Sequence, residues 1–147
     1  MVKKAKTVTY YEAIGRRKSA VALVRLYISP KASKTTSSMN KGDFLINSIP
    51  AKEYFQFEPY VQLFQLPLHV VDALERFAIS VIATGGGKRG QLDAVRLGLA
   101  RALEQADENN RKKLKAEGLL TRDSRVRERR KAGTGGRARR KKQSPKR

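Results

Sequence analysis

The last 26 residues of this 147-residue chain are too polar and too charged to join a packed core. From Arg122 to Arg147 they include thirteen basic and two acidic residues, a net charge of +11, and their aliphatic side chains are one valine and two alanines. Such a segment buries too little apolar surface to offset the entropy lost on ordering. We therefore predict a flexible basic N-terminus over residues 1–9, a globular body over 10–120, and an extended basic tail over 121–147 that is disordered when free.

The charge of the whole chain indicates a polyanionic partner. There are 33 basic and 13 acidic residues, which gives a formal net charge of +20. This excess favours nucleic acid. A membrane is the weaker alternative, because no apolar run approaches the roughly 18 to 20 residues that span a bilayer, and the tail has no apolar face to insert. We expect no membrane partner.

The sequence lacks two further features, a secretory signal and cysteine. The first 20 residues are basic but contain no apolar h-region, so they do not resemble a secretory signal. The chain has no cysteine, which excludes disulfides, thiolate chemistry and cysteine-ligated zinc.

Two apolar runs predict core strands. Residues 20–28, AVALVRLYI, place their even-numbered side chains from Ala22 to Ile28 on one face and Arg25 on the other. Residues 77–84, FAISVIAT, alternate bulky with smaller side chains, as a strand with a crowded core face does. The polar, Ser/Thr-rich segment from Ser29 to Gly42 is expected to be a loop. It leads to a short strand over residues 43–46, which we expect to pair with the first as an antiparallel hairpin.

Prolines punctuate the predicted helices between the strands. Pro50 suits the first position of a helix, with Ser48 as a possible cap. Pro59 and Pro67 divide the region up to Val71 into short helical pieces. The packing residues expected here are aromatic: Tyr54, Phe55 and Phe57.

The strongest helical pattern begins at Gln91. Arg96 and Arg101 point away from its apolar face. A second, basic helix over residues 110–116 ends at Gly118, which fits a C-terminal cap. The apolar residues of the first helix recur at helical spacing: Leu92, Val95, Leu99, Leu103 and Ala106.

The glycine-rich stretch GGGKRGQ, residues 85–91, lies between a predicted strand and this helix. Such a turn aims backbone N–H groups at an anion, and Lys88 and Arg89 add full charges. A nucleotide-binding P-loop is excluded, because Ile82 stands where that motif has glycine and Arg89 where it has Ser or Thr. A purely structural turn that needs glycine for its backbone angles stays open, and it is compatible with phosphate contact.

Three adjacent cations, Arg16, Arg17 and Lys18, precede the first predicted strand. They are candidates for phosphate contact. The alternative is a solvated run of charges that share no face.

The sequence offers little for catalysis. His69 is the only histidine and lies in the apolar stretch LPLHVV, where a structural role is expected. GxSxG and HExxH motifs are absent. Glu53 and Glu58 form no recognisable acid–base pair. Asp72, Glu75 and Asp93 are explained as helix-surface charges. We expect no enzymatic activity, no cofactor and no metal.

The tail has the composition of a phosphate-binding arm. It carries basic residues at irregular spacing with no aromatic side chain between them, which disfavours recognition of single strands by base stacking. Fully extended at about 3.3 Å per residue, 26 residues reach on the order of 80 Å. The alternative is a tail that only raises solubility. The candidate phosphate ligands are Arg122, Arg125, Arg127, Arg129, Arg130, Lys131, Arg137, Arg139, Arg140, Lys141 and Lys142.

Four stretches of the chain are distinctive: IGRRKSAVALVRLY, INSIPAKEYF, GGGKRGQLDAVRLGLARAL and LLTRDSRVRERRKAG, followed by a terminal Lys-Arg. Together they resemble one known family, the bacterial-type S-nine proteins of the small ribosomal subunit. The resemblance covers nearly the whole chain from Tyr11, in order and spacing. Ala132 and Ser144 stand where the family often has Tyr and Phe, Pro145 precedes the final pair, and the loop from Ser29 to Gly42 is longer than usual.

The resemblance implies a fold and a set of partners. The fold is α+β, like the second domain of the ribosomal S-five protein: a mainly antiparallel sheet with helices on one face and a left-handed βαβ crossover. The partners are small-subunit rRNA in the head, neighbouring head proteins and the peptidyl-site tRNA, and the chain is not a homo-oligomer. Lys146 and Arg147 would lie against the tRNA anticodon stem-loop backbone. The expected location is the ribosome of the cytoplasm or of a translating organelle.

Two alternatives from other functional classes remain at this stage. One is a free nucleic-acid-binding module, such as an RNA chaperone or a DNA-compacting protein. The other is an enzyme acting on nucleic acid, which would need a carboxylate cluster to hold a divalent metal.

Overall fold

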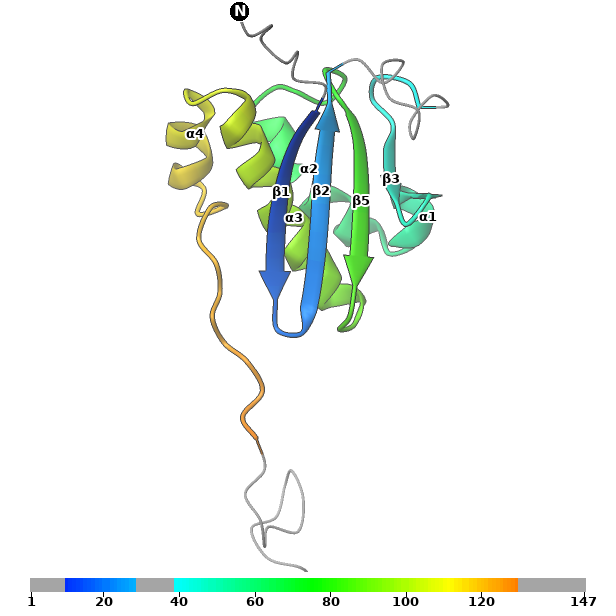
Figure 1. Ribbon diagram of the computed structural model, residues 1–147, viewed down its shortest axis with the longest axis vertical. Helices are drawn as coiled ribbons and strands as arrows, with labels where there is room; N and C mark the ends of the chain where they lie inside the picture. Colours follow the sequence, from blue (N-terminus) through cyan, green and yellow to red (C-terminus); the bar gives the residue numbers. More distant parts are fainter. Residues whose placement is uncertain (1–9, 29–38, 130–147) are drawn as a thin grey trace, which may run out of the picture.

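A single five-stranded sheet organises the molecule (Figure 1), which the computed structural model describes over residues 10–28 and 39–129. The spatial order of the strands is β1-β2-β5-β3-β4, and every neighbouring pair is antiparallel except β3 and β5. The mixed α/β architecture expected from the sequence is confirmed. The strands are β1 (Tyr10–Arg17), β2 (Ala20–Tyr27), β3 (Phe44–Ile46), β4 (Ile49–Pro50) and β5 (Ala78–Thr84).

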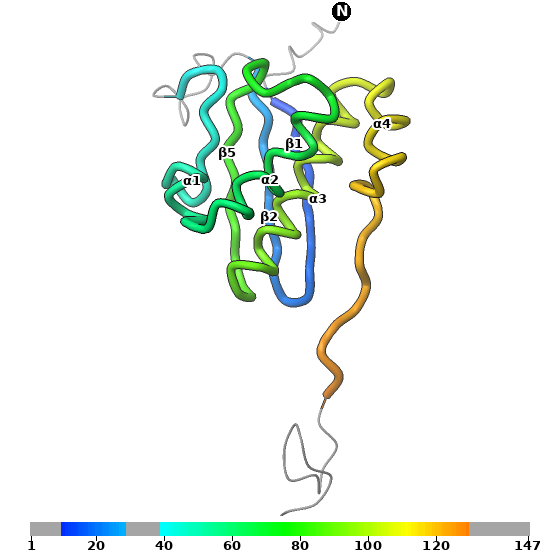
Figure 2. Tube along the Cα trace, turned by 180° about the vertical axis from the view of Figure 1, so that it is seen from behind, coloured from blue at the N-terminus to red at the C-terminus, as the bar shows by residue number. Residues whose placement is uncertain are grey.

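Helices cover one face of this sheet, so that the body has two layers (Figures 1 and 2). In the view from behind, α2 and α3 lie in front of the strands, and α4 lies beyond the β1 edge. None of the helices in the described ranges is long and apolar enough to cross a membrane. The helices are α1 (Ala51–Tyr54), α2 (Glu58–Val70), α3 (Lys88–Ala106) and α4 (Asn110–Ala116).

The core lies between the sheet and α3, as the hydrophobic periodicity predicts. In register, Val24 of β2 pairs with Ala13 of β1 on one side and Val81 of β5 on the other, and all three side chains are buried. The predicted apolar positions of the long helix are buried or packed against the core. Ile28 is an exception. It was expected on the core face but is 42% exposed, because β2 ends at Tyr27.

The N-terminal strand β1 was missed, and the predicted hairpin was wrong. β2 forms its hairpin with β1, through a turn at Lys18 and Ser19, whereas β3 pairs with β5. Two of the inward-facing positions of β1 are occupied by the small residues Ala13 and Gly15, so the hydrophobic pattern of this strand is weak. Small residues are required here. A Cβ on Gly15 would lie 1.8 Å from the main-chain oxygen of Ala94 in α3.

The region of the prolines also differs from expectation. Pro50 lies at the N-cap of α1 rather than at its first position, and Ser48 makes no capping bond but has a φ of +68° in the β3–β4 turn. The stretch after Pro59 is one continuous helix, α2, that contains Pro67. The ring of Phe57, expected to pack, is 59% exposed.

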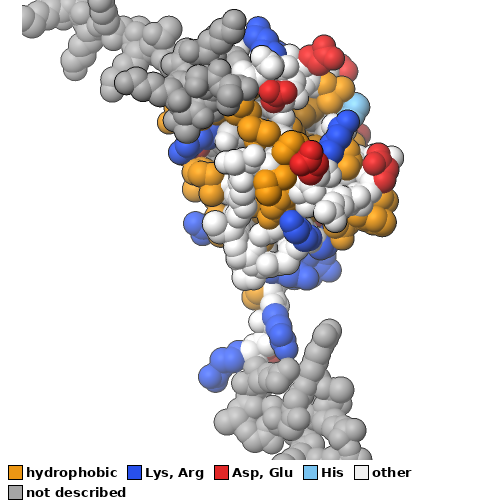
Figure 3. Space-filling view, turned by 90° about the vertical axis from the view of Figure 1, so that its right-hand side faces the viewer, with side chains coloured by type: hydrophobic (Ala, Val, Ile, Leu, Met, Phe, Trp, Pro, Cys, Tyr) orange, Lys and Arg blue, Asp and Glu red, His pale blue; other side chains and the backbone are white. Residues whose placement is uncertain are grey.

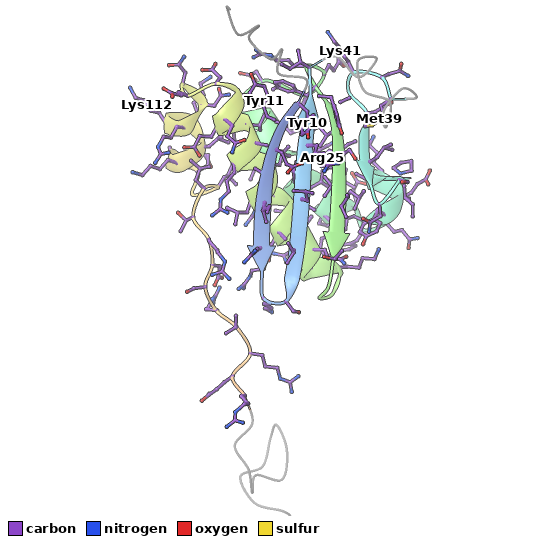
Figure 4. All side chains as sticks on the ribbon, viewed as in Figure 1. Tyr10, Tyr11, Arg25, Met39, Lys41 and Lys112 are labelled. Atoms are coloured by element: carbon purple, nitrogen blue, oxygen red, sulfur yellow. The ribbon has the colours of Figure 1, made fainter. Side chains whose placement is uncertain are left out.

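None of the helices in the described residues covers the second face of the sheet (Figure 1). Arg25 points to this face, as predicted, and pairs with Glu12 across the hairpin at 2.6 Å. Its guanidinium also lies 5.6 Å from the ring centre of Tyr10, on the same face (Figure 4). The hydrogen bond to Glu12 raises the pKa of Arg25 above its ordinary value.

Candidate nucleic-acid interface

Two basic stretches that are far apart in the sequence meet at one end of the sheet. Val21 pairs with Thr84 in the β2–β5 register, so the β1–β2 turn lies beside the glycine-rich turn that precedes α3. We call this region the basic end, defined by Arg16, Lys18 and Arg89. The described part of the tail, which we call the arm, runs past it (Figure 1), and Lys and Arg side chains gather there in the side view (Figure 3).

The glycine-rich turn is built for close approach. Gly85 and Gly86 have φ values of +68° and +64°, in the left-handed region that favours glycine. A Cβ on Gly85 would lie 2.5 Å from the main-chain oxygen of Ser19, and one on Gly86 would lie 2.9 Å from the Cβ of Ala20. The structural explanation of these two glycines is therefore correct. Gly87 differs, because no heavy atom lies within 4 Å of the position that its Cβ would take.

Lys88 is turned toward the body. Its Nζ donates a hydrogen bond to the main-chain oxygen of Tyr54 at 3.1 Å and lies 3.3 Å from the centre of that ring. Gln91 adds two hydrogen bonds to this contact. Its side chain accepts one from the Tyr54 hydroxyl and donates one to the main-chain oxygen of Gly85. The lysine that sequence reasoning offered as a phosphate ligand thus helps to fasten α3 to α1.

Arg17 also serves the fold. Its side chain is 13% exposed, and its guanidinium lies 3.6 Å from Asp93 of α3 and 3.0 Å from Asp123 of the arm. It donates a further hydrogen bond to the main-chain oxygen of Arg125 at 3.0 Å. One side chain therefore joins β1, α3 and the arm. Of the three adjacent cations in the sequence, the middle one binds within the molecule, while Arg16 and Lys18 are exposed.

The first residues of the arm, 121–125, which we call the arm root, are held to the body by this contact. Asp123 accepts hydrogen bonds from the guanidinium and the backbone N–H of Arg125. These bonds, and the positive charges of Arg125 and Arg17, hold the pKa of Asp123 well below its ordinary value of 3.8. The same pairing raises the pKa of Arg125.

Most of the outward-pointing cations at this end have no acidic partner among the described residues. Among the described residues, no carboxylate lies within ion-pair distance of Arg16, Lys18 or Arg96. Arg89 is 58% exposed at its side chain and makes one long contact, 3.8 Å, to Asp93. In the arm the exposed cations with no acidic partner among the described residues are Arg122, Arg127 and Arg129.

Arg96 is the residue of this surface that sequence reasoning missed. Its spacing held the signal, because Arg89, Asp93 and Arg96 recur at four and three residues and therefore share one helical face. The remaining predicted ligands lie outside the described residues, as do Ala132, Ser144 and Pro145. They are Arg130, Lys131, Arg137, Arg139, Arg140, Lys141, Lys142, Lys146 and Arg147.

The described residues offer no metal centre. Within residues 10–28 and 39–129, no group of three or more His, Cys, Asp or Glu side chains is placed to hold a metal ion. His69 is exposed near the end of α2.

Comparison with known proteins agrees with the resemblance of the motifs. Residues 15–147 match the family described as ribosomal protein S9/S16. The chain is 46% identical to the small ribosomal subunit protein uS9c of Pyropia yezoensis over 129 residues, which cover 87% of this chain and 86% of the relative. It is 48% identical to uS9 of Tropheryma whipplei (strain Twist) over 121 residues, 82% of this chain and 71% of the relative.

A third relative, uS9 of Thermosynechococcus vestitus, is 48% identical over 124 residues, 84% of this chain and 82% of the relative. These matches confirm the family and the expectation of a ribosomal, non-enzymatic role, in the cytoplasm or in an organelle that translates its own messages. The basic end, the inward-turned Arg17 and the arm are features of a chain that belongs to the ribosomal protein S9/S16 family, structural constituents of the small ribosomal subunit.

Proposed function

We propose that this chain binds small-subunit rRNA in the head through the basic end of its body and through its arm. The observation that carries the proposal is the convergence of the β1–β2 turn, the start of α3 and the arm root at one end of the sheet. Exposed cations from all three segments, Lys18, Arg89 and Arg125, line one cavity. A surface of this kind suits a phosphate backbone.

Binding rests on phosphate contacts and on the shape of the folded RNA. The aromatic rings near the basic end are covered by cations, Tyr54 by Lys88 and Tyr60 by Arg89, rather than offered as stacking platforms for bases. Double-stranded RNA is recognised largely by its shape and backbone, which needs fixed cations on a rigid support. The sheet and α3 supply that support.

We propose further that the fold is of the ribosomal S-five second-domain type. In support, the parallel strands β3 and β5 are joined by a connection that contains α1 and α2. With both strands running downward in Figure 1, β5 lies to the left of β3 and α2 lies behind the sheet, which is the arrangement of a left-handed crossover. Right-handed crossovers are the rule, so this arrangement is a distinctive feature.

The rest of the tail, beyond the arm, would bind RNA at a distance from the body. Residues 130–147 hold nine basic and no acidic residues, and if fully extended they span on the order of 60 Å. We propose that they follow rRNA toward the peptidyl-tRNA site, where Lys146 and Arg147 contact the anticodon stem-loop backbone. The Lys146 ammonium and the Arg147 guanidinium make the phosphate contacts.

Neutralising two cations tests the role of the body. The double variant R16Q/K18Q removes two exposed charges and leaves the Arg17 contacts in place. We expect its affinity for a transcript of the small-subunit head rRNA to fall by about tenfold or more in a filter-binding assay, with a shallower dependence on salt. The matched control is K112Q/K113Q on α4, which removes the same charge at exposed positions away from the basic end (Figure 4). Equal losses for the two double variants would contradict a localised interface.

Stoichiometry separates a ribosomal component from a free nucleic-acid-binding module. We expect about one copy of the chain per small subunit by quantitative mass spectrometry across a sucrose gradient, after a salt wash. One copy also agrees with our proposal that the chain is not a homo-oligomer. A spread through free and polydisperse RNA fractions would favour the free module.

A further inference from the structure

We propose that the cavity between β1, α3 and the arm root binds one backbone phosphate of RNA, with Arg96 as its central ligand and Arg17 as the positioning residue that closes it. The proposal rests on the proposed rRNA binding and specifies one site within it. The cavity measures about 360 Å³. Six cations line it: Arg16, Arg17, Lys18, Arg89, Arg96 and Arg125.

The charge of this cavity is strongly unbalanced. The lining includes two carboxylates, Asp93 and Asp123. Both are occupied, since Asp93 lies 3.6 Å from Arg17 and 3.8 Å from Arg89, and Asp123 lies 3.0 Å from Arg17 and 2.6 Å from Arg125. Six positive and two negative groups leave a net charge of +4 around one small space. Cations crowded in this way repel one another unless an anion binds among them.

The uncompensated charge is contributed mainly by Arg96, with Arg16 and Lys18 at the β1–β2 turn. Among the described residues none of these three has a carboxylate within 4.0 Å. Arg96 is half-buried on α3, and Leu97 beside it is buried in the wall of the cavity. A guanidinium can bind phosphate oxygens with two parallel N–H groups, which the ammonium of a lysine does not.

The opposite wall is formed by the chain as it leaves α4, and it is fixed. Gly118 has a φ of +66°, and its N–H donates to the main-chain oxygen of Lys115 at 3.0 Å. Leu119 donates to the main-chain oxygen of Leu114 at 3.0 Å and is 5% exposed. These bonds end the helix and set the direction in which the chain leaves it. The cavity is therefore rigid on both sides.

Arg17 closes the cavity at the arm root. Its contacts with Asp93, Asp123 and the main-chain oxygen of Arg125 cross from β1 to α3 and to the arm. Without them the arm root has no described ion pair to the body. Holding the arm root beside α3 places cations of body and arm around the same phosphate before RNA binds, which lowers the entropic cost of binding.

The first test neutralises Arg96 in the full-length chain. With the head rRNA transcript as probe, we expect R96Q to raise the Kd about tenfold and to reduce the salt slope by about 1. The control K112Q, with the same loss of charge on α4, should change the Kd by less than about twofold. Inorganic phosphate is the second probe. It should shift the Arg96 Nε–H resonance of the wild type at millimolar concentration, and the transcript should displace it.

The second test changes the charge in the opposite sense. D123N breaks the ion pair with Arg17 but makes the chain more positive, so electrostatic attraction alone predicts tighter RNA binding. Positioning predicts weaker binding, by about threefold or more. E128Q makes the same charge change at an exposed acid that forms no ion pair among the described residues, and it should bind as tightly as the wild type or more so.

The outcomes separate the site from the function that it serves. If the wild type binds the transcript and R96Q behaves like K112Q, the phosphate site is wrong and rRNA binding stands. If D123N binds as tightly as E128Q, the positioning role of Arg17 is wrong. The site is also wrong if inorganic phosphate shifts the Arg96 Nε–H resonance but the transcript does not displace the phosphate. The cavity would then bind free phosphate alone. A wild type that fails to bind the transcript would remove the proposed function itself.

Discussion

At the residue scale, two glycines decide how closely α3 packs on the sheet. Gly15 of β1 faces Gly98 of α3, and a Cβ on Gly98 would lie 3.0 Å from the backbone nitrogen of Gly15 and 2.8 Å from Cγ2 of Val24. The absence of both side chains lets strand and helix backbones touch. This contact holds α3 against β1 and so brings Arg17 within reach of Asp93.

We expect G15A to lower the free energy of unfolding by about 3 kcal/mol or more, because the added methyl group meets backbone atoms that cannot rotate away. Urea denaturation followed by circular dichroism measures the change. G87A is the control. Its Cβ enters open space, so the loss there should stay below about 1 kcal/mol. A loss in G15A as small as in G87A would contradict the close approach.

A second prediction at this scale concerns Asp123 and pH. The hydrogen bonds from Arg125, with the charge of Arg17, depress the pKa of this carboxyl below 3.8. The ion pair of ionised Asp123 therefore stabilises the attachment of the arm root fully at pH values above the ordinary pKa of an aspartate. This stabilisation is lost only as the pH falls through the depressed pKa of Asp123. We expect NMR of the carboxyl carbons to show that Asp123 is still ionised at pH 4. Titration of Asp123 near pH 4 would contradict this.

At the element scale, Asn47 extends the pairing of the short strand β3. Its backbone N–H donates to the main-chain oxygen of Val81, and its side chain both accepts from the N–H of Ala83 at 2.9 Å and donates to the oxygen of Ala83 at 3.0 Å. Its φ of +50° is a conformation that asparagine tolerates. A side chain thus replaces backbone partners where β3 turns into β4.

N47A should lower the free energy of unfolding by about 1–3 kcal/mol, because it leaves both polar groups of Ala83 without their partner in a part-buried position. Amide hydrogen exchange at Ala83 should accelerate with it. N109A serves as the control, since this exposed asparagine makes no side-chain capping bond at α4. Equal stability of the two variants would show that water replaces the Asn47 bonds without cost.

The elements also differ in how well the sequence predicts them. α3 is long and its apolar residues recur at helical spacing, so its pattern is unambiguous over five turns. β1 lacks such a pattern, because close packing against α3 requires small residues at Ala13 and Gly15. The predicted pairing of β3 was wrong for a different reason. Its partner β5 lies more than 30 residues further along the chain, and three residues carry no register signal.

At the scale of the whole molecule, the proposed function gives the body and the tail separate tasks. The body presents fixed cations at one end, and the arm starts from that end at a root held by Arg17. Under the proposed function, deletion of Lys146 and Arg147 leaves the body and its rRNA contacts unchanged. We expect small subunits to assemble normally with this variant and to release peptidyl-site tRNA faster, by a few-fold, at low and moderate salt.

Tests of this deletion need a control for loss of charge alone. The variant R130Q/K131Q removes two cations nearer the body and keeps the terminal pair, so it should leave the tRNA off-rate close to that of the wild type. Unchanged off-rates in the deletion at every salt concentration would exclude the proposed contact of the last two residues with tRNA.

The sequence by itself determined the charge and composition of the C-terminal segment, the helix α3 and the family, because composition, periodicity and motif spacing are properties of the linear chain. The tertiary structure alone decided the strand order, the inward turn of Arg17 and Lys88, and the place of Arg96 in a cavity. The physical reason is distance along the chain. Arg17 and Arg125 are 108 positions apart, and the contact between them exists only once β1, α3 and α4 have packed.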